Sequence, residues 1–452
     1  MTTNDLSTLL DDFAKVLAND PGALDADSKL YVQNLHGKGA EDVVSVLSRT
    51  IQRSDEPGQL YYFSGQRGTG KSTELKRLTT LLNGQPKTRS YVVDALEYLV
   101  DTHPLDTIDL LLVIAIAFAD RLSQADGLGE SQPTQDGLIT RFMNWLQSDV
   151  SITSATVGGV KAEFRAQQQS IVARLREFDL SRQERVMAEC RKYICEMADA
   201  VRAKWQCEKV VLMVDSLERL RGIGVQAKEM FDRIVKVFDG DLNQLRIPRL
   251  HLILAVPPYL PYLTNVKVLV QLFVLASVRV CEPPSKARRQ PREDGVAVMR
   301  SVVDKRFPRW GDLIEKAALD RLILASGGDV RQLLRRLVLD ALDEAYYAQE
   351  SLPLKETDPI IETVLARHTV ELQNLVVREE FPLLKGIAES NALTLDRRED
   401  LPVAAIFFNV RAVLSYRNGK EWLDLNPLLW SLIEAWQRPA SAFPVHESGE
   451  TS

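Results

Sequence analysis

The chain has 452 residues, a formal net charge of −6 at pH 7 and 45% apolar residues. This length predicts two or three domains, and the composition is ordinary for a globular protein. The negative charge argues against a surface made for general binding to nucleic acid or to membranes. The sequence shows neither an N-terminal signal segment nor an apolar run long enough to cross a bilayer. We therefore expect a cytoplasmic protein without membrane association.

The first 35 residues are expected to be mostly helical. Apolar side chains recur at helical spacing, and Asp20-Pro21-Gly22 then stops the helix. The residues that share this apolar face are Leu6, Leu9, Leu10, Phe13 and Leu17. A glycine-containing turn over residues 35–42 leads into a second predicted helix over residues 43–51.

A phosphate-binding loop follows. A short β-prone run over residues 60–63 and a helical pattern over residues 73–82 flank a complete G-x-x-x-x-G-K-[ST] motif. The binding residues are expected to be Gly65, Gln66, Arg67, Gly68, Thr69, Gly70, Lys71, Ser72 and Thr73. Glycines let backbone N–H groups approach a polyphosphate, Lys71 supplies positive charge, and the Ser72 hydroxyl suits Mg²⁺. The motif therefore predicts binding of a nucleoside triphosphate. The turn over residues 35–42 then either cups the adenine or simply precedes a packing helix.

Further strands are expected over residues 90–94, 209–215, 250–256 and 272–280, with helices between them, which predicts a parallel α/β core. An insertion over residues 124–206 interrupts this core. We expect it to contain a short helix with Phe142 and Trp145, a β-hairpin over residues 150–164 around Gly158-Gly159, and a long helix over residues 182–204. Such an insertion either recognises a partner or is packing decoration.

A proline- and charge-rich break over residues 282–292 predicts a domain boundary. Residues 293–348 and 359–390 are predicted to be helical, and Asn418-Gly419 between two alternating runs predicts a hairpin. The expected divisions are a helical segment (1–35), a P-loop core (36–285), a helical lid (286–350), a winged-helix-like α+β domain (351–438) and a disordered tail (439–452).

Three residues outside the phosphate loop are candidates for the chemistry. Asp215, at the end of an apolar strand, is expected to hold Mg²⁺ through its water shell. Glu218 is either the acid that orients a water molecule or a solvated side chain at a helix start. Arg331 follows the turn Ser326-Gly327-Gly328-Asp329, from which it would reach the γ-phosphate, or it is a surface arginine.

The phosphate loop, the strand ending in Asp215-Ser216-Leu217-Glu218, the turn before Arg331 and the C-terminal hairpin together resemble the AAA+/STAND class of P-loop ATPases over residues 36–435. The order of the segments is similar to that of the origin-recognition-like branch. The resemblance implies ATP and Mg²⁺ as cofactors, hydrolysis to ADP, and control of self-association or of a protein effector, with signalling or antiviral defence as the typical setting.

The chain departs from that class at two positions. Ser216 stands where the usual second acid follows Asp215, and Ala255-Val256-Pro257 offers no polar residue where the first sensor normally lies. The first departure implies that hydrolysis is either slow or uses Glu218, and the second argues against strong hydrolytic coupling. An arginine finger acting on a neighbouring subunit is not assigned, and the candidates by position are Arg219, Arg221, Arg246 and Arg249.

Two functions compete. The first is a nucleotide-dependent switch, and the second is an initiator or loader that binds DNA through the winged helix. The sequence disfavours DNA, because residues 401–408 are apolar where a reading helix needs polar side chains. Residues 373–452 also carry eight Lys/Arg against eleven Asp/Glu, which weakens attraction to phosphates. A small-molecule kinase would need neither the lid nor the winged helix.

Overall fold

The computed structural model describes residues 3–20, 22–126, 137–153, 157–220, 226–282, 289–349 and 351–436. At its centre lies a five-stranded parallel sheet in the order β2-β3-β4-β1-β5. The strands are β1 (Leu60–Gly65), β2 (Thr88–Asp94), β3 (Lys209–Asp215), β4 (His251–Val256) and β5 (Gln271–Leu275). Every residue of β1 and β4 is buried, as expected for parallel strands covered on both faces. The predicted α/β core is confirmed.

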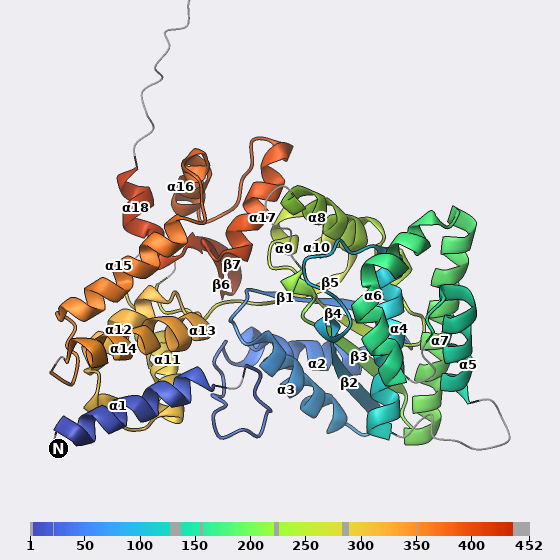
Figure 1. The fold of residues 1–452 in the computed structure, drawn as a ribbon, viewed down its shortest axis with the longest axis horizontal. Coiled ribbons are helices and arrows are strands. Elements are labelled where there is room, and N and C mark those ends of the chain that lie inside the picture. The colour runs from blue at the N-terminus through green and yellow to red at the C-terminus, as the bar shows by residue number, and fades with distance from the viewer. Residues whose placement is uncertain are drawn as a thin grey trace, which may run out of the picture.

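Helices cover both faces of the sheet (Figure 1). On one face lie α2 (Val43–Arg53) and α3 (Lys71–Asn83). On the other lie α4 (Thr107–Asp126), α7 (Leu180–Trp205) and α8 (Gln226–Val235). Side chains along β1 alternate, so that Tyr61 and Phe63 join the first layer while Leu60 and Tyr62 join the second. The result is the three-layered αβα sandwich of a P-loop NTPase.

The insertion is helical where it is described. It contains α5 (Leu138–Trp145) and α6 (Val157–Glu177) and continues into α7. The predicted β-hairpin over residues 150–164 is wrong, because residues 157–164 form the first turns of α6; residues 154–156 lie outside the described ranges. Val160, Phe164 and Ile171 are fully buried, and their spacing places them on one helical face that packs on α4.

A helical unit follows the core, as predicted. It consists of α11 (Glu293–Arg306), α12 (Lys316–Ala325), α13 (Val330–Gln332), α14 (Leu339–Ala348) and α15 (Pro359–Gln373). The N-terminal helix α1 (Thr3–Ala18) packs on this unit (Figure 1). The Phe13 and Phe307 rings stack with centroids 4.5 Å apart. The N-terminal helix therefore shares a core with a segment that lies far away in the sequence.

The C-terminal part combines helices with an antiparallel β pair. Its elements are α16 (Phe381–Ser390), α17 (Leu401–Asn409), β6 (Val413–Asn418), β7 (Lys420–Leu425) and α18 (Trp430–Ala435). Asn418 pairs with Lys420 across Gly419, whose φ of 85° suits the tight turn, so the predicted hairpin is confirmed. The winged-helix assignment and the domain divisions stay predictions. Residues 283–288 of the predicted boundary and the predicted tail 439–452 lie outside the described ranges.

The chain that leaves β5 connects the sheet to the rest of the molecule. The predicted strand over residues 272–280 ends at Leu275, and Ser277 N–H donates a hydrogen bond to the Ser415 carbonyl oxygen of β6 (2.9 Å). Two short helices, α9 (Leu260–Leu263) and α10 (Val266–Leu269), join β4 to β5. Over the described ranges, none of the helices is long and apolar enough to cross a membrane.

Candidate nucleotide-binding site

The phosphate loop runs from the end of β1 to the start of α3. Within it, the Lys71 ammonium group lies 2.9 Å from the Gln66 carbonyl oxygen and 3.1 Å from the Glu218 carboxylate. The Lys71 and Glu218 side chains are only 3% and 6% exposed. The charge that would meet a phosphate is therefore already neutralised by a buried acid from the turn after β3.

Asp215 ends β3, and β4 lies between β3 and the phosphate-loop strand β1. Its carboxylate accepts a hydrogen bond from the Ser216 backbone N–H (2.7 Å). Burial, followed by the nearby charge of Glu218, raises the pKa of Asp215 to about 6, while a hydrogen bond from Ser72 acts in the opposite direction. A hydroxyl and a buried carboxylate are hard oxygen donors, so Ser72 and Asp215 fit Mg²⁺, whose positive charge would favour the ionised acid.

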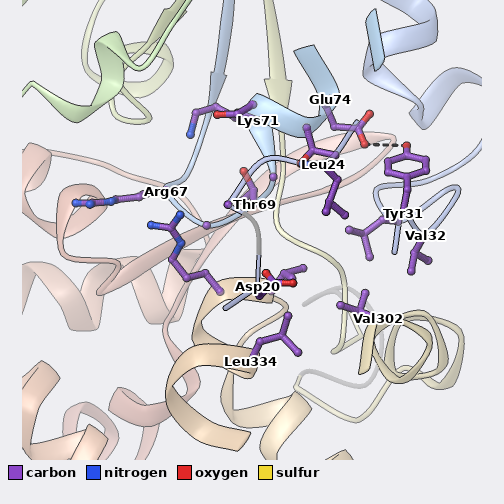
Figure 2. A pocket seen from close by; sticks show the side chains of 18 of the residues that line it. Asp20, Leu24, Tyr31, Val32, Arg67, Thr69, Lys71, Glu74, Val302 and Leu334 are labelled. Atoms are coloured by element: carbon purple, nitrogen blue, oxygen red, sulfur yellow. Dashed lines mark hydrogen bonds between the residues drawn. The ribbon is translucent and has the colours of Figure 1, made fainter. Parts of the chain in front are cut away.

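One end of the pocket beside the phosphate loop is apolar. Leu24, Leu30 and Val32 reach it from the segment that follows α1, and Val302 and Leu334 reach it from the helical unit. Figure 2 shows Leu24, Val32, Val302 and Leu334 of this group around a hollow, with Arg67 and Lys71 on its other side. The shape suits a ligand with a flat apolar base at one end and a polyanion at the other.

The segment after α1 is fixed to the phosphate-loop helix. The Leu24 N–H donates a hydrogen bond to the Thr73 hydroxyl (3.0 Å), and the Tyr31 hydroxyl donates one to Glu74 (2.9 Å). Sequence reasoning missed these residues as part of the site. Their apolar side chains follow no regular period, so the available signal was the cluster of bulky side chains just ahead of a phosphate loop.

His36 contributes a polar group to the pocket. Its Nδ1 lies 2.9 Å from the Ala276 carbonyl oxygen, and its Nε2 is buried without a hydrogen-bond partner among the described residues. Burial lowers the pKa of His36, so the ring is neutral near pH 7. From the turn over residues 35–42, Leu35 and His36 line this pocket, whereas the rest of the turn leads into α2.

Several arginines line the pocket. Arg306 is paired with Asp20 (2.6 Å), and Arg335 donates a hydrogen bond to the Asp20 carbonyl oxygen. Arg331 lines the same pocket and forms no ion pair with any described residue. Partial desolvation, followed by the charge of Arg335, lowers the pKa of Arg331. A polyanion bound here would relieve this crowding of positive charge.

The turn before Arg331 touches the phosphate loop directly. Gly68 has a φ of 99°, and a methyl group added there would lie 2.4 Å from Asp329 Oδ1. Asp329 is buried, caps α13 by accepting from the Gln332 N–H (2.9 Å), and pairs with Arg411 (2.8 Å). Gly328 packs equally closely, because a Cβ there would lie 1.9 Å from the Val278 carbonyl oxygen. Glycines at these two positions allow the phosphate loop, the turn before Arg331 and the chain at Val278 to pack against one another.

A second contact connects the phosphate loop to the C-terminal hairpin. The buried Gln66 amide donates a hydrogen bond to the Val413 carbonyl oxygen at the start of β6. The Tyr416 hydroxyl of the same strand donates to the Gly327 carbonyl oxygen (2.9 Å). Phosphate loop, helical unit and hairpin are therefore joined at one place.

The arginines that are candidates for an arginine finger lie in different parts of the structure. Arg219 lines the nucleotide pocket. Arg246 donates a hydrogen bond to the Leu269 carbonyl oxygen (2.9 Å), and Arg249 pairs with Asp199 (2.7 Å). Arg221 lies outside the described ranges. The structure thus brings Lys71, Ser72, Asp215, Glu218 and Arg331 to one site, while their chemical roles stay predictions.

Comparison with known proteins gives remote structural matches. No family model and no curated relative matches the sequence.

Similar solved structures include the Walker-type ATPase PABY2304 of Pyrococcus abyssi, with 12% identity and a TM-score of 0.39. The match covers 88% of this chain and 95% of that chain. The ORC2 protein of Aeropyrum pernix, solved in ADPNP–ADP complexes, has 10% identity and a TM-score of 0.38, with coverages of 93% and 96%. Cdc6p of Pyrobaculum aerophilum has 11% identity and a TM-score of 0.35, with the same coverages. At this distance the matches say nothing about what this chain binds.

Proposed function

We propose that the protein is a Mg²⁺-dependent ATP-binding switch in which the nucleotide controls the position of the C-terminal part. The observation that carries the proposal is the hydrogen bond from Gln66, inside the phosphate loop, to Val413 of the C-terminal hairpin. Because this contact is direct, a movement of the phosphate loop on nucleotide binding would shift the hairpin without a helix or strand between them.

The ion pair of Lys71 and Glu218 supports a nucleotide-free state in which the phosphate loop stays bound to the hairpin. The Lys71 ammonium group also donates to the carbonyl oxygen of Gln66, the residue whose side chain holds the hairpin. A triphosphate would compete for Lys71 and draw it away from both partners. ATP binding therefore acts on the same residue that fixes the hairpin.

The contact between Gly68 and Asp329 supports a role for the helical unit. Asp329 lies against the phosphate loop and is held by Arg411, the residue just before the hairpin. Arg331, two residues along, lines the same pocket, and we propose that it meets the terminal phosphate. Under this proposal a γ-phosphate pulls Arg331 inward and strains the Asp329–Arg411 pair, whereas ADP leaves it intact.

Slow hydrolysis fits a switch. Ser216 replaces the second acid and adopts a left-handed conformation with a φ of 69°. The position after β4 holds Pro257, whose carbonyl oxygen accepts from the Ser64 hydroxyl (3.2 Å), so this position contributes no polar side chain to the site. A long-lived ATP state would give a partner time to bind.

The output of the switch is proposed to be self-association or binding of a protein effector, as in STAND-like signalling or antiviral defence. Light scattering of the full chain with and without Mg²⁺-ATP tests this directly. We expect a change of mass or shape on adding ATP, and no change in the Lys71→Ala variant. Identical mass and shape in both states would refute the switch.

DNA binding receives less support from the geometry. In α17, the helix just before the hairpin, Ala404, Ala405, Phe407 and Phe408 are buried, and Phe408 stacks on Tyr262 with centroids 5.3 Å apart. The partly exposed residues Leu401, Val403 and Ile406 are apolar, so they offer no polar side chain to read base edges in the major groove. Titration with duplex DNA at low salt checks this point, because phosphate-driven binding would weaken steeply as salt rises.

A further inference from the structure

Two acidic residues end neighbouring strands at the same level of the sheet. Asp94 of β2 is the register partner of Asp215 of β3. Two residues earlier on each strand, Val92 and Met213 pack in the layer formed by α2 and α3. Because side chains alternate along a strand, Asp94 and Asp215 project from this same face, at the edge where α3 begins with Lys71 and Ser72.

A hollow at this edge adjoins the nucleotide pocket. Its wall includes Asp94, Asp215 and Ser72. The hollow and the nucleotide pocket share the residues Gly22, Ser72, Ser216, Arg219 and Arg331. Asp94 therefore lines a hollow that meets the nucleotide pocket at Ser72 and Arg331.

The Asp94 carboxylate is held in place but keeps an oxygen for another partner. It accepts a hydrogen bond from the Leu96 N–H (2.9 Å), which caps a short helical turn after β2. Its other oxygen accepts no hydrogen bond from the described residues, and the side chain is half-buried. A fixed carboxylate with one available oxygen is suited to orienting a water molecule.

Glu218, the other acid near the site, is placed differently. Its carboxylate is buried beside Lys71, and its second oxygen lies without a partner among the described residues. Glu218 does not line the hollow, whereas Asp94 lines it together with Ser72 and Asp215. A water molecule in the hollow therefore meets Asp94 and not Glu218.

We propose that Asp94 is the catalytic carboxylate that orients the attacking water in ATP hydrolysis; this inference rests on the proposed ATPase function. The water oxygen bonds to the γ-phosphorus, and the bond from that phosphorus to the β–γ bridging oxygen breaks. ADP leaves with the bonding electron pair. One proton of the water passes along its hydrogen bond to Asp94 and from there to solvent. Positioning of this kind supplies a large part of catalysis in phosphoryl transfer.

The test compares Asp94→Asn with wild-type full-length protein in single turnover of γ-labelled Mg²⁺-ATP. An asparagine keeps an oxygen that accepts from the Leu96 N–H, so the turn after β2 is preserved. We expect hydrolysis to fall at least about tenfold, with affinity for a non-hydrolysable ATP analogue unchanged. The nucleotide recovered from the variant after incubation should be ATP, whereas wild type yields ADP. Asp94→Ser, which also caps the turn but has no carboxylate, should behave in the same way.

Glu97→Gln is the matched control, because Glu97 lines the same hollow but pairs with Lys161. Its hydrolysis should equal that of wild type. Unchanged hydrolysis in Asp94→Asn, or a loss confined to Glu218→Gln, would overturn the assignment while leaving the ATPase proposal standing. A wild-type protein that binds Mg²⁺-ATP but never cleaves it would overturn both the assignment and the hydrolytic part of the proposed function.

Discussion

The ammonium group of Lys71 lies 3.1 Å from the carboxylate of Glu218, and both side chains are buried. Lys71, the residue that we propose binds the phosphates, therefore already has an anionic partner in the absence of nucleotide. Breaking a buried ion pair on one side leaves an uncompensated charge, which is costly. A triphosphate must therefore replace Glu218 as the partner of Lys71. The free energy needed to break this ion pair lowers the affinity for the nucleotide.

Glu218→Gln should tighten binding of ATP. The substitution removes the competitor for Lys71 and a negative charge beside an anionic ligand, so we expect an affinity gain of about tenfold, or ~1.4 kcal/mol. Isothermal titration with a non-hydrolysable analogue measures it. Glu97→Gln, which alters a carboxylate away from Lys71, is the control and should leave the affinity unchanged. Equal or weaker binding by Glu218→Gln would show that the pair does not oppose the nucleotide.

The stability of the nucleotide-free protein should depend on Asp215. Its folded-state pKa of about 6 lies above the usual value of 3.8 for an aspartate, so the folded state holds a proton that the unfolded chain releases. The stabilisation is fully present below about pH 4 and is lost as pH rises through about 6. Asp215→Asn should remove this dependence and raise the free energy of unfolding near pH 7.5 by about 1–3 kcal/mol.

Chemical denaturation of wild type and Asp215→Asn near pH 5 and pH 7.5, with EDTA present, measures this difference. The same variant should lose the Mg²⁺-dependent part of ATP affinity, because an amide is a weaker ligand than a carboxylate. If the variant were less stable than wild type at both pH values, Asp215 would be a structural residue and not one held ready for a cation.

Gln66→Leu should weaken the hold of the phosphate loop on the hairpin. The change keeps the size of the side chain but removes the donor to the buried Val413 carbonyl oxygen, which costs about 1–3 kcal/mol. We expect a lower melting temperature without nucleotide and a gain in ATP affinity, because less of the binding energy is used to open the contact. A variant that is less stable but binds ATP with unchanged affinity would show that this hydrogen bond does not take part in the switch.

Local patterns predicted much of this molecule. The phosphate loop and the Asn418-Gly419 hairpin each depend on residue types at fixed short spacing, and both fold as expected. The hairpin around Gly158-Gly159 failed because burial of Val160 and Phe164 against α4 outweighs the turn preference of two glycines.

The long-range part of the site could not be read from the sequence. The hydrogen bond of Gln66 joins residues 347 positions apart, and no local rule links Asp329 to Gly68. The apolar end of the pocket was missed for a related reason. Leu24 and Val32 lie in irregular chain, where hydrophobic side chains carry no period that reveals which surface they cover.

The proposed switch requires that the hairpin respond to nucleotide in the phosphate loop. Hydrogen exchange of the backbone amides over residues 411–418, with and without Mg²⁺-ATP, tests it most directly. We expect ATP to speed exchange in this segment about tenfold or more in wild type and to leave it unchanged in Lys71→Ala. Exchange that is the same with and without ATP, in a wild-type protein shown to bind it, would rule out the switch.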